Sequence, residues 1–74
     1  MTPEILANLR NILAVLYSDD LSIQRVIADA GILPARIKFN AAAIDVWHFI
    51  LTEATKLNQV EILLTVVERE YSSN

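Results

Sequence analysis

One histidine, His48, is the only side chain in this sequence that suggests acid–base chemistry. Histidine is the usual general base at neutral pH, and Asp45, three residues earlier, shares a face with it if the segment is helical. Glu53 follows on the same segment. A lone histidine beside a large apolar side chain, here Trp47, is far more often a boundary residue than a catalyst. We therefore expect no active site at His48.

Other patterns that carry chemistry are missing from the sequence. It has no cysteine, one glycine and one histidine, which excludes thiolate metal sites, the usual zinc constellations and a glycine-rich phosphate loop. No serine or threonine stands in a nucleophile motif. The sequence thus predicts a protein that is not an enzyme and that binds neither a cofactor nor a metal.

The composition bounds the class of protein. The 74 residues suffice for one small domain, which buries only about 60 % of its unfolded surface. Hydrophobic residues make up 54 % of the chain, yet its longest apolar run is far below the roughly 18 to 20 residues of a membrane span. The net charge of −3 disfavours nucleic acid as a partner. No secretory signal pattern opens the sequence, so we expect a cytoplasmic protein that is not bound to a membrane.

The segment around the single tryptophan predicts the central helix. Asn40 is a good N-cap, alanines follow it, and no glycine or proline intervenes before Asn58, which suits a left-handed closing position. We expect a helix over residues 41–57, with Phe39 packed against its first turn. Its apolar face centres on Trp47. The face comprises Ala43, Trp47, Ile50, Leu51 and Ala54.

Two helices are predicted before the central one. Thr2 as N-cap and Pro3 at the first helical position start a helix over residues 3–17. Its expected core stripe is Ile5, Leu9, Ile12, Leu13 and Leu16. A break at residues 18–20 precedes a second helix over 21–30, which Gly31 ends in the left-handed conformation. Its expected core face is Ile23, Val26, Ile27 and Ala30.

The rest of the chain supplies a short turn and a last helix. Pro34 can only begin a helix, so residues 33–37 predict a single turn, possibly of the 3₁₀ type. Asn58 as N-cap precedes a helix over 59–70, and residues 72–74 read as a polar tail or the start of a linker. Its expected face is Val60, Leu63, Leu64, Val67 and Tyr71.

The expected fold is all-α: a compact bundle of four main helices and one short turn, formed by a single domain over residues 1–71. The hub of its core is expected at Trp47, Leu51, Ile27 and Leu64.

Apolar side chains exceed what one small core needs. Some fall away from the expected core faces, and exposed apolar patches on small proteins often mark a partner surface. A wide stripe buried in a tightly wrapped bundle is the alternative. These side chains are Leu6, Val15, Val46, Phe49, Ile62 and Val66.

The charged residues suggest a second kind of contact. The basic residues Arg25, Arg36 and Lys38 lie apart in the sequence from the acidic pair Asp19 and Asp20. Opposite patches on one molecule allow head-to-tail association of identical or sibling domains. These five residues are the candidate partner-binding residues, and a merely solvated surface is the alternative. A further acidic group contains Glu68 and Glu70.

An ordered series of residues between Leu16 and Tyr71 resembles the first type of bacterial effector-associated domain. The resemblance covers nearly the whole of that span and depends on the series, since no single motif in it is catalytic. The series comprises Leu16 and Tyr17 before an acidic pair; residues 25–32; Arg36, Ile37 and Phe39; Ala43, Trp47, His48, Ile50, Leu51, Glu53 and Ala54; and Leu63, Leu64, Val67, Glu70 and Tyr71.

The resemblance implies a death-like helical fold and an adaptor function. Such domains are regarded as recruiting or assembling effectors, among them proteases, signalling ATPases and TIR domains, through contacts between like domains in bacterial immunity. The chain departs from the family pattern where Ser18 and Ser72 replace prolines and Asn58 replaces a glycine. These are turn positions with tolerable substitutes. The alternative function is a free-standing small regulator or inhibitor that binds an unrelated protein.

Overall fold

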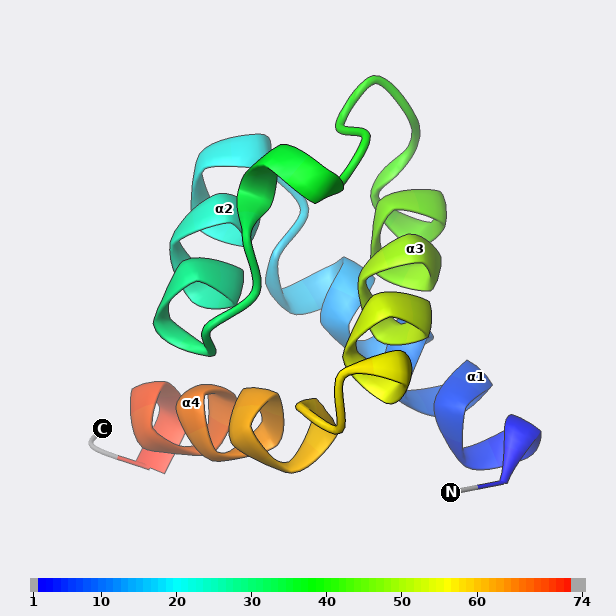
Figure 1. Ribbon diagram of the computed structural model, residues 1–74, viewed down its shortest axis with the longest axis vertical. Coiled ribbons are helices and arrows are strands. Elements are labelled where there is room, and N and C mark those ends of the chain that lie inside the picture. The colour runs from blue at the N-terminus through cyan, green and yellow to red at the C-terminus, as the bar shows by residue number, and fades with distance from the viewer. Residues whose placement is uncertain (1, 73–74) are drawn as a thin grey trace.

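The fold is all-α, as the sequence predicts. The computed structural model describes residues 2–72, and within that range it contains four α-helices, one 3₁₀ turn and no strand (Figure 1). Helix α1 packs against α3, α2 packs against α4 and the 3₁₀ turn, and α3 also contacts α4. The elements are α1 (Pro3–Leu16), α2 (Asp20–Asp29), η1 (Pro34–Arg36), α3 (Ala43–Lys56) and α4 (Val60–Ser72).

Side-chain caps begin the first two helices. The Thr2 hydroxyl accepts a hydrogen bond from the Ile5 amide at 3.3 Å, and the Asp19 carboxylate accepts one from the Ser22 amide at 3.0 Å. Each bond satisfies an amide that has no partner inside its helix. The predicted start of α1 is therefore confirmed, and α2 begins at Asp20, one residue earlier than expected.

Left-handed residues end α2 and α3. Gly31 has a φ of +83°, and the amide of the next residue, Ile32, donates to the Ile27 carbonyl at 2.9 Å. Asn58 has a φ of 57°, and the Gln59 amide donates to the Ala54 carbonyl at 2.8 Å. Both arrangements are Schellman motifs, which give the last helical carbonyls a donor. The closing positions predicted at Gly31 and Asn58 are confirmed.

Asn40 does not cap the central helix, and that prediction is wrong. Helix α3 begins at Ala43, with Ala42 as an N-cap that makes no side-chain hydrogen bond. Ile37 is buried and Phe39 is half-buried against the core. Packing of these two side chains fixes the chain after η1, so residues 38–42 form the loop that arches above α3 in Figure 1 instead of a first helical turn.

The C-terminal helix also differs from its prediction. Helix α4 begins at Val60, because Asn58 closes α3 and is therefore not the N-cap of α4. The helix continues through Ser72, which was expected in the polar tail. The other two residues of that predicted tail, 73 and 74, lie outside the described range.

The core is built around Trp47, which is fully buried. Its indole N–H donates to the Tyr17 carbonyl at 2.9 Å, so the largest core side chain also holds the end of α1. Leu51 and Ile27 are buried as predicted. Leu64, which was expected at the hub of the core, is only half-buried. The neighbouring Leu63 is fully buried instead.

Two further core predictions need correction. Val46 is fully buried, although it was expected outside the main face of the central helix. On α1, Leu13 is the buried residue of the expected stripe, while Ile5, Ile12 and Leu16 are exposed. Apolar residues surround most of α1, so its sequence permits more than one buried face, and packing against α3 selects the face that contains Leu13.

Candidate interaction sites

His48 does not form an acid–base pair. The side chain is exposed on α3, and its ring lies edge-on to that of Phe49, with 6.1 Å between centroids. Within residues 2–72 no hydrogen bond or ion pair joins His48 to Asp45 or Glu53. The His48 carbonyl accepts a hydrogen bond from the Thr52 hydroxyl at 2.8 Å, which is a local helix contact.

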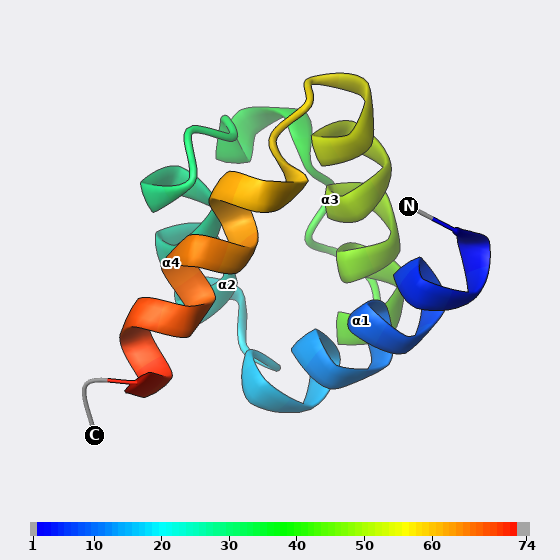
Figure 2. The same cartoon turned by 90° about the horizontal axis from the view of Figure 1, so that it is seen from below.

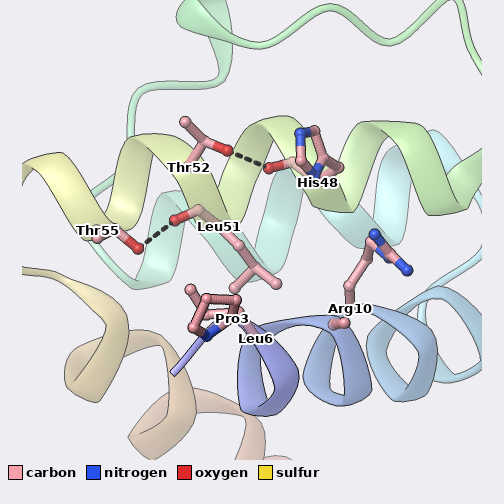
Figure 3. A pocket seen from close by; sticks show the side chains of 8 residues that line it. Pro3, Leu6, Arg10, His48, Leu51, Thr52 and Thr55 are labelled. Atoms are coloured by element: carbon pink, nitrogen blue, oxygen red, sulfur yellow. Dashed lines mark hydrogen bonds between the residues drawn. The ribbon is translucent and has the colours of Figure 1, made fainter. Parts of the chain in front are cut away.

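A groove of about 200 Å³ runs between α1 and α3, and His48 lies on its rim (Figure 3). Leu6 and Leu51 face each other across it from the two helices, and Pro3 lies near Leu6. The residues that line it are Pro3, Leu6, Ala7, Arg10, His48, Leu51, Thr52 and Thr55. None of them is acidic, so the groove combines an apolar surface with cationic or donor groups.

Arg10 is the polar feature of this groove. It is half-buried on the core side of α1, and its Nε is buried without a hydrogen-bond partner among the described residues. Its terminal nitrogen makes one long contact, 3.4 Å to the Asn11 side-chain oxygen. Figure 3 shows Arg10 at the same end of the groove as His48 and far from Thr55. The groove thus has one end rich in N–H donors.

Arg10 is not among the site residues predicted from the sequence. A usable signal was present, because Leu6, Arg10 and Leu13 recur at the three-and-four spacing of one helix face. An arginine inside an apolar stripe keeps its stem on the apolar surface while its head reaches a charged or polar group. That pattern is typical of a groove edge.

Arg25, one of the predicted partner-binding residues, is paired inside the domain. Its guanidinium lies 2.9 Å from the Glu70 carboxylate, and the two side chains are 53 % and 26 % exposed. The hydrogen bond from Arg25 holds the pKa of Glu70 below its ordinary value, and the same bond raises the pKa of Arg25. This pair joins α2 to α4, so Arg25 is a poor candidate for a free interface cation.

The other predicted charges divide between structural and exposed positions. Asp19 caps α2, and hydrogen bonds from Ser22 lower the pKa of its carboxyl group. Asp20 is exposed in the first turn of α2. Arg36 and Lys38 are exposed near η1 and form no ion pair with any described residue. The structure therefore leaves Asp20, Arg36 and Lys38 available to a partner.

Tyr17 connects three helices, a role that the periodicity of the sequence did not reveal. Its ring centroid lies 6.0 Å from that of Trp47 and 6.0 Å from that of Tyr71. Burial raises the pKa of its phenol to about 12, and the negative charge of the nearby Glu70 carboxylate adds to the effect. Tyr17 therefore stays neutral through the physiological range and serves packing.

Large apolar side chains remain outside the core on every α-helix. Val15 on α1 and Leu21 on α2 are the most exposed, at 79 % and 80 %. Phe49 and Ile62 are half exposed, in line with their predicted place off the core faces. Among the described residues, the exposed large apolar side chains are Ile5, Ile12, Val15, Leu16, Leu21, Leu33, Ile44, Phe49, Leu57, Ile62 and Tyr71.

The described residues contain no group of three or more histidine, cysteine, aspartate or glutamate side chains arranged to hold a metal ion. None of their helices has both the length and the apolar character needed to cross a membrane. Comparisons with models of protein families, with curated proteins and with solved structures found no match for this chain.

Proposed function

We propose that this chain is a non-catalytic protein interaction module of the cytoplasm. In this proposal it is an adaptor that recruits or assembles effector proteins through contacts between like domains in bacterial immunity. One structural observation carries the proposal: a core completed around Trp47 still leaves the large apolar side chain of Leu21 80 % exposed. Exposed apolar side chains on a small domain cost solubility, and a partner that covers them offsets that cost.

The resemblance to the effector-associated family supports the choice of a like domain as the partner. It extends from Leu16 to Tyr71 and includes the core residues Trp47 and Leu51. Adaptors of that family are regarded as working by association, and exposed charges of opposite sign would contribute to contacts between two copies. Asp20 on α2 and the cations Arg36 and Lys38 near η1 are complementary in sign.

Light scattering over a concentration series tests this proposal. We expect the average mass to rise with protein concentration, and to rise less at high salt, because ions screen contacts between exposed charges. A monomer at every concentration and at both salt levels would contradict association between like domains.

A second candidate function is a small regulator that binds an unrelated protein, and the groove between α1 and α3 favours it. A groove of about 200 Å³ with an apolar surface and one donor-rich end is suited to an apolar side chain with a neighbouring acid. This candidate predicts a monomer that binds a purified non-homologous partner, and it predicts that a bulky Thr52→Trp substitution at the groove abolishes that binding.

A further inference from the structure

The groove between α1 and α3 has a complement on α2. Leu21 is 80 % exposed at the second residue of that helix, and it follows Asp20, which is also exposed. An aliphatic side chain next to a carboxylate matches an apolar groove with an arginine at one end. We propose that the groove binds Leu21 of a second copy of this chain, with the Asp20 carboxylate of that copy at Arg10. The inference rests on the proposed function, since it names the surfaces through which like domains meet.

The groove favours a carboxylate for a specific chemical reason. The hydrogen bond that the Arg10 guanidinium makes among the described residues is long, 3.4 Å from a terminal nitrogen to the Asn11 side chain, and no acidic residue lines the groove. The terminal N–H groups of Arg10 thus keep donor capacity, and a carboxylate from a partner would accept a charge-assisted hydrogen bond from them. Asp20 is better placed for this than Asp19, whose side chain already caps α2.

The groove also favours an aliphatic side chain. The hydroxyls of Thr52 and Thr55 donate to the backbone carbonyls of His48 and Leu51, at 2.8 Å and 2.7 Å. Both hydroxyl protons are therefore already used in hydrogen bonds inside α3. These two side chains have no further proton to donate to a group bound in the groove. An aliphatic side chain gains from leaving water here without leaving many polar groups unpaired.

The two surfaces lie on different parts of the fold. Leu21 belongs to α2, which packs on α4 and η1, whereas the groove lies between α1 and α3 (Figures 1 and 3). A contact between two different surfaces of identical molecules is heterologous, so each copy offers one free Leu21 and one free groove to further copies. Association therefore builds a ring or an open chain instead of a closed pair with two-fold symmetry.

Sedimentation of surface variants tests the inference. Leu21→Ser is expected to weaken association roughly 10- to 100-fold, because the contact loses most of one buried leucine side chain. Val15→Ser is the matched control: Val15 is equally exposed but does not line the groove, so its loss is expected to leave association unchanged. Circular dichroism of both variants establishes that the fold is retained.

Mixing two defective variants tests the head-to-tail geometry. Leu21→Ser keeps a functional groove, and Thr52→Trp blocks the groove but keeps Leu21. Each variant alone is expected to sediment as a monomer, while their mixture is expected to form a one-to-one pair that does not grow further.

Asp20→Asn is expected to weaken association about 3- to 10-fold and to reduce its dependence on salt.

The possible outcomes separate this inference from the proposed function. If the wild-type protein associates and Leu21→Ser associates equally well, the named surfaces are wrong while association between like domains stands. If the mixture of variants stays monomeric although wild type associates, the head-to-tail contact is wrong. If wild type is monomeric at all concentrations, both proposals are contradicted.

Discussion

At the level of single residues, stability depends on the contact between Trp47 and Tyr17. The indole ring is fully buried, and its N–H is the donor for the carbonyl that ends α1. One side chain thus supplies both core volume and a helix-end hydrogen bond. In a domain of this size, whose total stability is expected to be only a few kcal/mol, that combination is decisive.

Trp47→Phe is expected to lower the free energy of unfolding by about 2–4 kcal/mol, because it leaves a cavity and deprives the buried Tyr17 carbonyl of its donor. Urea denaturation followed by far-ultraviolet circular dichroism measures the change. Phe49→Ala on the exposed side of the same helix is the control and is expected to cost less than about 1 kcal/mol. Equal losses for the two variants would contradict the central place of Trp47.

The phenol of Tyr17 predicts a specific loss of stability at high pH. Its pKa is raised from 10.0 to about 12 in the folded protein, so between these values the unfolded chain releases the proton first. The unfolded state is then favoured, and stability falls as the pH rises through that window. Below pH 10 the effect is absent.

Tyr17→Phe is expected to remove this part of the alkaline loss, and Tyr71→Phe, which alters a half-exposed ring beside it, is the control. Urea midpoints measured between pH 10 and about 12 give the slopes. An unchanged slope in Tyr17→Phe would show that the buried phenol does not titrate as described.

At the level of the helices, the ends of α2 and α3 were predicted more accurately than the start of α3. Gly31 and Asn58 are among the few residues that tolerate a positive φ, and both occupy such positions. Asn40 has a good N-cap side chain, but tertiary packing of Ile37 and Phe39 decides where α3 begins. Local capping is worth about 1 kcal/mol, which burial of two large apolar side chains exceeds.

Core faces were predictable where a helix is apolar on one side only. All four residues expected inside on α2 are buried, whereas α1, with apolar residues on several sides, buries Leu13 and exposes Ile12. The groove between α1 and α3 depends on which face of α1 packs against α3, so it could not be placed from periodicity alone. Nor could the pairing of Arg25 with Glu70, which lie far apart in the sequence and meet only after α2 packs on α4.

The two left-handed positions predict opposite effects of substitution. Gly31→Ala is expected to cost about 1–2 kcal/mol, because alanine is strained at a φ of +83° and its Cβ would lie 3.3 Å from the Gln59 side-chain nitrogen. Asn58→Gly is expected to stabilise the domain by about 0.5–1 kcal/mol, since glycine adopts a φ of 57° without that strain. Urea denaturation of both variants measures the difference, and a shift of the same sign in both would contradict this account of the helix ends.

At the level of the whole molecule, the surface is divided between charges that pair within the fold and groups that the fold leaves exposed. Arg25 and Asp19 stabilise contacts inside the domain. Leu21 and Asp20 are consecutive exposed residues at the start of α2, while the groove with Arg10 lies between α1 and α3. Figures 1 and 2 show α2 beside α4, on the other side of the molecule from α3. Such a division suits a module whose copies bind one another in series.

An NMR dilution series of the isotope-labelled wild-type protein tests the central claim most directly. On raising the concentration, we expect backbone amide shifts to change in the first turn of α2 and along the groove between α1 and α3, and to stay constant around Val15. The Leu21→Ser variant is expected to show none of these changes. Shifts that do not depend on concentration, or changes confined to α4, would contradict the claim that this chain binds a second copy of itself through those two surfaces.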